Sequence, residues 1–225
     1  MIEIHGLEGT QFRLGEAVVP PGELAAVVAP TLACAREFVD LALGLSDPRT
    51  GVVRLFGQPL AEMDEGGRLA LRARIGFAAR SEGLIAHLTM WENILLGAEY
   101  HHARDAAAVD ARLRTLLGWF GWRAEDARQA FLRWPEEVTP FERTVAAWLR
   151  ALLSEPECLV CEDILSGLAA DQRRRLIGAS VSFLSEDPRR GSVFVLVGDH
   201  LVEELQPTSM FYLSLHGDFR AEAQA

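Results

Sequence analysis

Two cysteines, Cys158 and Cys161, have the C-x-x-C spacing that can bind a metal ion or carry out thiol–disulfide chemistry. A structural metal site needs a second pair of ligands, and the only other cysteine is Cys34. Residues 158–161 form an apolar run typical of a buried strand, in which these two side chains point to opposite faces. We therefore interpret all three cysteines as small core residues. The histidines His101 and His102 follow an expected helix end, and we interpret them as a cap and a solvent contact.

The elements that could position a reactive site are clearest near the start of the chain. Residues 24–28 are apolar throughout, which is typical of a buried parallel strand. A loop and a helix at residues 34–45 are predicted to follow, with Phe38 and Leu45 on the inner face of the helix. Strand, loop and helix are the setting of the phosphate-binding motif G-x-x-x-x-G-K-[ST]. The stretch 28–38 nevertheless contains none of the residues that bind phosphate.

Six segments of the sequence, spread over nearly the whole chain, carry a specific resemblance to one family. They are residues 20–24, 50–60, 74–80 with 88–94, 135–143 with 150–153, 159–168 and 195–200. In this order they resemble the phosphate-loop entry, the strand after the first helix, the Q-loop, the signature motif, Walker B with the D-loop, and the switch strand of the nucleotide-binding subunit of an ATP-binding cassette (ABC) transporter. The resemblance implies an α/β fold with a P-loop NTPase (RecA-like) core, an antiparallel β edge and a helical subdomain.

The phosphate-loop position departs from the family pattern at every residue that does chemistry. A P-loop holds phosphates with backbone N–H groups between glycines, a lysine charge and a hydroxyl that ligates Mg²⁺. No other lysine can replace the missing one, because all 22 basic residues are arginine. We expect Glu37, as a carboxylate in the first helical turn, to repel a nucleotide and to act as a substitute anion. The glycine positions read Ala29, Leu32 and Cys34, the lysine position reads Ala35, and the hydroxyl positions read Arg36 and Glu37.

The Q-loop, signature and D-loop positions are also replaced. The Q-loop glutamine, which in the family touches metal and attacking water, is Arg80, and the D-loop aspartate is Ala169. We expect Pro140 to remove a backbone N–H and Phe141 to fill space at the start of the helix that follows the signature motif. Phosphate then cannot approach the N-terminus of that helix. The signature residues that would bind the γ-phosphate read Val138, Thr139, Pro140, Phe141 and Glu142.

Two residue pairs retain the family's residue types but in inverted order. The Asp-Glu pair of Walker B appears as Glu162-Asp163, and the His-Asp pair of the switch strand appears as Asp199-His200. One carboxylate of such a pair could hold Mg²⁺ while the other acts as general base. We interpret Glu162 and Asp163 instead as residual polar residues at a strand end.

Composition predicts one globular unit and argues against some classes of partner. The chain has 225 residues, of which 49% are hydrophobic and 24% charged, and this is enough for a large α/β core. The net charge of −10 argues against nucleic acid and against an anionic membrane surface as direct partners. No run of eighteen apolar residues and no leader is recognised, so we expect neither direct membrane insertion nor secretion. The three cysteines fit a reducing cytoplasm.

The family resemblance also predicts the organisation and the partner surface. We expect residues 1–85 and 155–215 to form the core, 86–154 the helical subdomain, and 218–225 a flexible tail. In the family the permease docks beside the Q-loop, which predicts a surface at Leu84, Ile85, His87 and Trp91. The alternative is that these apolar residues close the core of the subdomain itself. Most of the five tryptophans are expected to be core residues: Trp91, Trp119, Trp122, Trp134 and Trp148.

The function implied is that of a degenerate ABC ATPase-like subunit with a structural or regulatory role in a bacterial transporter complex. We expect no bound ATP, Mg²⁺ or other metal, a transmembrane permease as partner, and a homodimer or a heterodimer with an ABC ATPase. The location expected is the inner face of the cytoplasmic membrane, reached through the permease. Residues 83–96 with Tyr100 and His101 are similar to the ATPases of MCE-type lipid transport systems. Two alternatives remain open: an active but atypical ATPase that uses Glu162, Asp163 and His200, and a binding module that uses the vestigial pocket.

Overall fold

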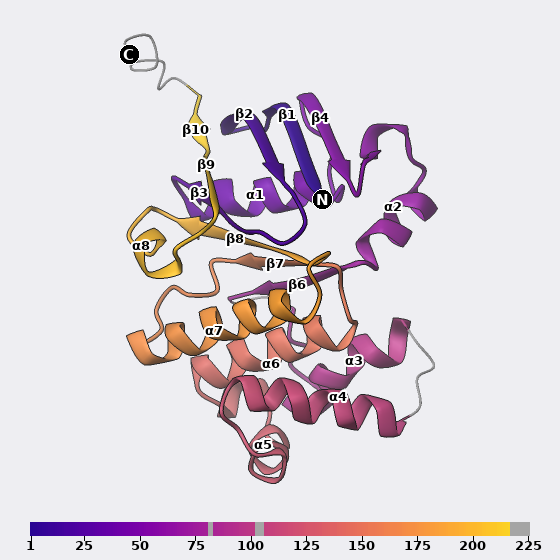
Figure 1. Ribbon diagram of the computed structural model, residues 1–225, viewed down its shortest axis with the longest axis vertical. Helices are drawn as coiled ribbons and strands as arrows, with labels where there is room; N and C mark the ends of the chain where they lie inside the picture. Colours follow the sequence, from indigo (N-terminus) through magenta and orange to yellow (C-terminus); the bar gives the residue numbers. More distant parts are fainter. Residues whose placement is uncertain (81–82, 102–105, 217–225) are drawn as a thin grey trace.

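The computed structural model describes residues 1–80, 83–101 and 106–216, and the predicted tail at 218–225 lies outside them. Its backbone forms two five-stranded sheets, one antiparallel and one parallel (Figure 1). The antiparallel sheet has the order β10-β2-β1-β4-β5, with β10 (Ser214–Leu215), β2 (Phe12–Val19), β1 (Ile2–Glu8), β4 (Thr50–Leu55) and β5 (Gln58–Pro59). The parallel sheet has the order β6-β7-β8-β3-β9, with β6 (Ile75–Ala79), β7 (Cys158–Glu162), β8 (Gly191–Val197), β3 (Leu24–Ala29) and β9 (Ser209–Tyr212).

Two hydrophobic clusters lie on opposite faces of the parallel sheet. One joins this sheet to the antiparallel sheet and encloses α1 (Leu32–Ala42), which lies between the two in Figure 1. The other joins the opposite face of the parallel sheet to the helices between β6 and β7 and to the helix Ala170–Glu186. All six residues of β3 are buried, as expected for a parallel strand covered on both faces. Cys158 and Cys161 belong to different clusters, so the prediction that they point to opposite faces of one strand is confirmed.

The helices between β6 and β7 pack around Trp148, which is fully buried. Its ring lies 5.9 Å from that of Phe120 and 6.5 Å from that of Phe194 on β8, and so connects the helical segment to the parallel sheet. Trp134 is 42% exposed and does not follow the core pattern. The helices are α2 (Glu65–Arg72), α3 (Met90–His101), α4 (Ala106–Trp119), α5 (Ala124–Phe131), α6 (Pro140–Leu153), α7 (Ala170–Glu186) and α8 (Val202–Leu205), with 3-10 turns at Leu60–Glu62 and Pro135–Glu137.

The predicted bounds of the first helix were wrong at both ends. The helix begins at Leu32 rather than Cys34, because the Thr31 hydroxyl caps it by accepting a hydrogen bond from the Cys34 N–H. It ends at Ala42, and Gly44 then adopts a left-handed conformation with φ of 65°. Leu45 consequently lies outside the helix and is 58% exposed instead of facing the core.

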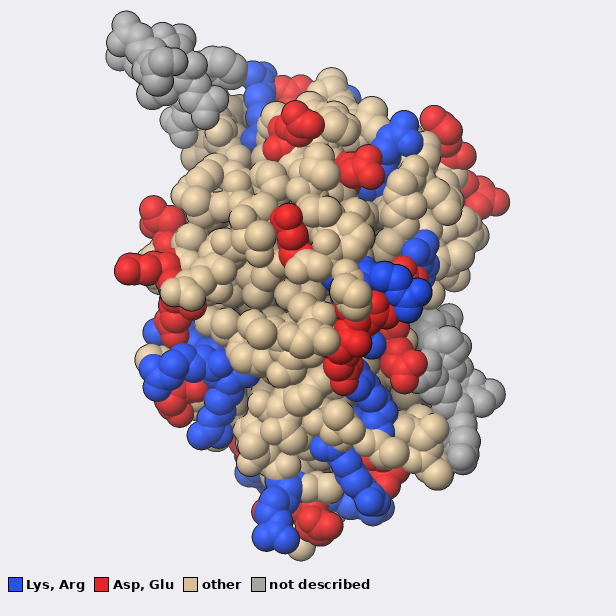
Figure 2. Space-filling view, in the orientation of Figure 1, with Lys and Arg blue, Asp and Glu red and all other residues tan. Residues whose placement is uncertain are grey.

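Charged side chains of both signs are interspersed over the surface. Figure 2 shows blue and red side chains side by side over the helical half of the molecule, with no single broad basic area on this face. Within the part of the chain that the structure describes, no helix is both long and apolar enough to cross a membrane.

Candidate functional site

The junction between β3 and α1 occupies the predicted phosphate-loop position. Only two residues, Pro30 and Thr31, separate the strand from the helix. The Cys34 N–H donates to the Thr31 hydroxyl at 3.1 Å, and the Ala35 N–H donates to the Thr31 carbonyl at 3.0 Å. Cys34 and Ala35 are fully buried. A P-loop presents its backbone N–H groups to phosphate, whereas here the amides of these two residues are already bonded within the chain.

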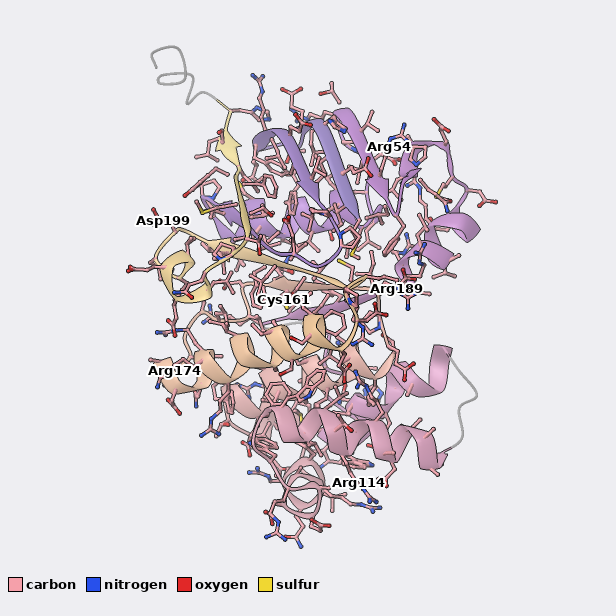
Figure 3. The ribbon with its side chains drawn as sticks, in the orientation of Figure 1. Arg54, Arg114, Cys161, Arg174, Arg189 and Asp199 are labelled. Carbon is pink, nitrogen blue, oxygen red and sulfur yellow. The ribbon has the colours of Figure 1, made fainter. Side chains whose placement is uncertain are left out.

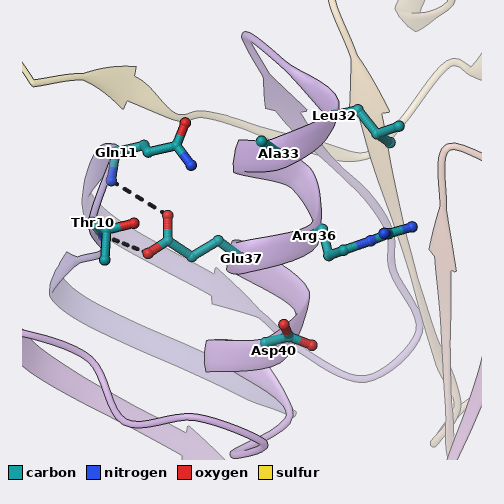
Figure 4. Close-up of a pocket in the computed structure, with 7 residues that line it drawn as sticks. All are labelled: Thr10, Gln11, Leu32, Ala33, Arg36, Glu37 and Asp40. Carbon is teal, nitrogen blue, oxygen red and sulfur yellow. Dashed lines mark hydrogen bonds between the residues drawn. The ribbon is translucent and has the colours of Figure 1, made fainter.

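Glu37 faces the turn between β1 and β2 rather than the start of the helix. Its carboxylate accepts hydrogen bonds from the N–H groups of Thr10 and Gln11, the latter at 3.3 Å (Figure 4). Burial raises the pKa of the Glu37 carboxyl, but these hydrogen bonds outweigh it and hold the pKa below its ordinary value. The expectation that Glu37 acts as a substitute anion in the first turn was wrong, because the helix begins at Leu32 and Glu37 lies in its second turn.

Arg36 and Arg80 each form an ion pair with one of two adjacent carboxylates, Glu162 at the end of β7 and Asp163 directly after it. The Nε atom of Arg36 lies 3.5 Å from Oε1 of Glu162, and an Nη atom of Arg80 lies 3.1 Å from Oδ2 of Asp163. Both carboxylate residues are 4% exposed, while the guanidinium side chains are about half exposed. We name Arg36, Arg80, Glu162 and Asp163 the four-charge cluster. It joins α1 and the ends of β6 and β7 through charged side chains.

The backbone around the cluster holds its members in register. The Arg80 N–H donates to the Glu162 carbonyl at 3.1 Å, and the Asp163 N–H donates to the carbonyl of Val195 on β8 at 2.8 Å. The Ser166 hydroxyl donates to the Oδ1 atom of Asp163, the carboxylate oxygen that does not face Arg80. Sequence reasoning placed all four residues at family positions but missed their pairing. The available signal was charge balance: two positions that hold polar uncharged residues in the family both read arginine.

Asp199 and His200 lie apart from these pairs, on the exposed turn after β8. Asp199 lies at the margin of the molecule near α8, while Cys161 lies in its interior (Figure 3). The His200 ring folds back over Gly198, since a Cβ atom on that glycine would be 3.3 Å from His200 Nδ1. Among the residues placed by the structure, neither side chain forms a hydrogen bond or an ion pair. The geometry therefore gives His200 no contact with Glu162 or Asp163.

The signature position, residues 138–142, is a capped helix start. Thr139 caps α6, and Pro140 is the first residue of the helix. The Glu142 carboxylate forms an ion pair with Arg133, with an Nη atom 2.6 Å from its Oε1 atom. Phe141 is 8% exposed and lies edge-on to the Trp122 ring, with centroids 6.4 Å apart. The expectation that Phe141 fills the space in front of the helix was wrong, because its ring is a core residue of the helical segment. The carboxylate of Glu142 occupies the helix N-terminus instead.

The predicted partner surface comprises the loop before α3, which a buried asparagine organises, and Trp91 in the first turn of α3. Asn93 is fully buried; its amide N–H group donates to the carbonyls of Ile85, Leu88 and Thr89 at 3.0, 3.1 and 3.0 Å. Its amide oxygen accepts from the Ile85 N–H at 2.7 Å. Sequence reasoning missed this role of Asn93, which an uncharged polar residue directly before the apolar run Ile94–Leu96 could have indicated.

The four predicted contact residues divide into two kinds. Leu84 and Trp91 are partly buried and pack against the helical core, and the Arg128 guanidinium lies 5.5 Å from the centre of the Trp91 ring. Ile85 is partly exposed and His87 is exposed. Only the second pair is thus free of a core contact, which makes it the sharper probe of a partner surface.

Comparisons with solved structures identify the fold of this chain. No family model matches the sequence. Among solved structures, a dimeric ATP-binding cassette in a post-hydrolysis state with ADP and Pi has a TM-score of 0.78 at 17% identity, covering 95% of this chain and 94% of that one. An ATP-binding subunit of an ABC transporter has a TM-score of 0.76 at 21% identity, covering 95% and 85%. The fold is that of an ABC ATPase cassette, so the predicted fold class is confirmed.

Curated sequence relatives are ATP-binding proteins of import systems. The methionine import ATP-binding protein MetN 2 of Paraburkholderia xenovorans is 28% identical over 159 residues, which are 71% of this chain and 40% of that protein. The sulfate/thiosulfate import ATP-binding protein CysA of Burkholderia mallei is 28% identical over 181 residues, 78% of this chain and 48% of that protein. The resemblance to ABC transporter nucleotide-binding subunits is confirmed. The chain spans about half the length of these relatives.

Proposed function

We propose that this chain is an ABC ATPase-like subunit that serves a bacterial membrane transporter without hydrolysing ATP itself. The observation that carries the proposal is the four-charge cluster. In P-loop NTPases the P-loop hydroxyl and the Walker B carboxylate hold Mg²⁺ between them. Here the corresponding residues, Arg36 and Glu162, form an ion pair with each other. The capped starts of α1 and α6 add support. At each helix start a threonine hydroxyl, of Thr31 or Thr139, accepts a hydrogen bond from a backbone N–H at the place where phosphate would bind.

Nucleotide binding tests the proposal directly. Calorimetric titration of the purified chain with ATP and Mg²⁺ is expected to show no binding at millimolar nucleotide, and an intact ABC cassette treated in the same way serves as positive control. Binding in the micromolar range that depends on Mg²⁺ would contradict the proposal. It would favour the second candidate, an atypical ATPase, which is suggested by the relatives being ATP-binding proteins. In that case Glu162→Gln should abolish hydrolysis.

The partner proposed is a transmembrane permease, with a homodimer or a heterodimer with an active ABC ATPase as the assembly. One similar structure is cbiO1 of Clostridium perfringens, part of an ABC transporter complex, at 14% identity, a TM-score of 0.76 and coverage of 95% and 84%. Such a subunit would sit at the inner face of the cytoplasmic membrane. The cargo proposed from the similarity at residues 83–96 is lipid, and the import functions of the relatives make a small solute the competing outcome.

The docking surface can be tested with the two positions that do not pack against the helical core, the partly exposed Ile85 and the exposed His87. Ile85→Asp and His87→Asp are expected to abolish co-purification with the permease from the native host, while the melting temperature of the isolated chain stays the same. Leu132→Asp is a matched control, because Leu132 is 59% exposed and lies on another loop. Leu84→Asp is less useful, since Leu84 also packs against the helical core. Unchanged complex assembly would place the docking surface elsewhere.

A further inference from the structure

Arg150, on α6, is partly buried, and its guanidinium is bonded to a backbone carbonyl instead of a carboxylate. An Nη atom donates to the carbonyl of Gly83, in the loop before α3. Burial lowers the pKa of the Arg150 guanidinium, and no carboxylate within the described part of the chain forms an ion pair with it. Other arginines, with side chains 16–22% exposed, do pair with carboxylates: Arg68, Arg72, Arg112, Arg173 and Arg190.

Two glycines make room for the Arg150 side chain. A Cβ atom on Gly83 would lie 2.6 Å from an Nη atom of Arg150. A Cβ atom on Gly97 of α3 would lie 3.1 Å from the Arg150 carbonyl oxygen and 3.5 Å from its Cγ atom. Gly83 also has φ of 93°, a conformation that side chains rarely adopt. The stem of the arginine therefore lies against α3, and its guanidinium lies against the exposed Gly83.

This guanidinium lies at the predicted partner surface, where its own loop offers no counter-charge. Residues 83–89 contain no acidic side chain. The first carboxylate of α3, Glu92, already accepts hydrogen bonds from the Thr89 N–H and hydroxyl at 2.7 and 2.8 Å. A guanidinium can bind a carboxylate through two parallel hydrogen bonds. A partner that brings a carboxylate to this surface would therefore supply what the chain itself does not.

We propose that Arg150 pairs with a carboxylate of the transmembrane permease, so that an acidic side chain in a cytoplasmic segment of the permease docks over Gly83. The inference rests on the proposed function and names the chemistry of the partner at that surface. The sign of the charge carries it, because a partly desolvated cation favours an anionic partner over an apolar one.

The test measures how much permease co-purifies with the tagged chain from the native host. Arg150→Gln should lower the recovery about tenfold, whereas Arg150→Lys, which keeps the charge, should retain most of it. Recovery with the natural chain should also fall as NaCl rises from about 0.1 M to about 1 M, because salt screens ion pairs. Arg174→Gln, at an exposed position on α7, is the matched control and should leave recovery unchanged. Melting temperatures of the isolated variants show whether each one folds.

Substitutions in the permease keep the test decisive if Arg150→Gln destabilises the chain. Each aspartate or glutamate in the cytoplasmic segments of the co-purified permease is changed to the corresponding amide. One of these changes should reproduce the loss with the natural chain and add nothing further when combined with Arg150→Gln.

Two results would overturn the inference and leave the proposed function standing. The first is undiminished recovery with a folded Arg150→Gln variant, and the second is recovery that no acidic substitution in the permease lowers. If the natural chain recovers no permease at all, the proposed function is contradicted and this inference fails with it.

Discussion

Thr139 and Glu142 cap each other at the start of α6. The Thr139 hydroxyl accepts a hydrogen bond from the Glu142 N–H at 3.2 Å, and the Glu142 carboxylate accepts one from the Thr139 N–H at 2.6 Å. This reciprocal arrangement satisfies two amides that a helix N-terminus otherwise leaves unpaired. It also puts a fixed negative charge at the place where a helix attracts anions.

The first prediction concerns this cap. Thr139→Ala should lower the free energy of unfolding by about 0.5 to 2 kcal/mol, because the Glu142 N–H loses its acceptor. Urea unfolding followed by circular dichroism measures the change. Thr115→Ala is the control, since Thr115 is exposed in the interior of α4 and bonds only to its own helix. Equal effects of the two substitutions would show that the cap contributes nothing specific.

The second prediction concerns Asn93. Asn93→Ala should cost about 2 to 3 kcal/mol of folding free energy, because the carbonyls and the amide that it binds lose their partner. Hydrogen exchange at the Ile85 amide should become faster, and urea unfolding gives the stability. Gln129→Ala, which removes an exposed amide on α5, is expected to change neither quantity. An unaltered Ile85 exchange rate would mean that the loop is held by other contacts.

The local sequence pattern was sufficient to predict the buried parallel strand, but it was insufficient to predict the contacts of the candidate site. The apolar run that begins at Leu24 predicts a buried strand because hydrophobic patterning is a property of neighbouring residues. The helix start at Leu32 depends on one hydroxyl of Thr31, which an apolar pattern does not record. The pairing of Arg80 with Asp163 joins residues 83 positions apart, so it depends on the order of strands in the sheet.

The third prediction is that the thiols are unreactive in the folded chain. Burial raises the pKa of the Cys158 thiol to about 12 and raises that of Cys161 well above its ordinary value. Cys34 is fully buried. A thiol-specific reagent at pH 8 should therefore modify all three only after denaturation. The variant Ala33→Cys, at an exposed position on α1, should react rapidly and shows that the assay works. Rapid reaction of the native chain would contradict the buried placement.

The fourth prediction concerns pH and Glu186, which connects α7 to α4. Hydrogen bonds from Arg112, at 2.7 and 2.8 Å, and from Arg190 lower the pKa of the Glu186 carboxyl below 4.5. A carboxyl with a lowered native pKa stabilises the fold above its unfolded pKa and loses that effect as the pH falls through the native value.

Glu186→Gln should therefore be less stable than the natural chain at pH 7, and the difference should shrink between about pH 5 and pH 3. Melting temperatures across this range provide the measurement. Glu62→Gln, an exposed position in a 3-10 turn, should show no such convergence. A difference that stays constant with pH would show that the effect of Glu186 is not electrostatic.

The pairing within the four-charge cluster also sets a direction on how this sequence can change over generations. A step toward the P-loop pattern, such as Arg36→Ser, removes the guanidinium that pairs with the buried Glu162 carboxylate, and Arg80→Gln removes the one that pairs with Asp163. Each single substitution therefore lowers folding stability before it can contribute to phosphate binding, in a fold whose total margin is only about 5 to 15 kcal/mol. Selection for folding alone then keeps both arginines. Stepwise reversion of this sequence to the P-loop pattern is therefore disfavoured.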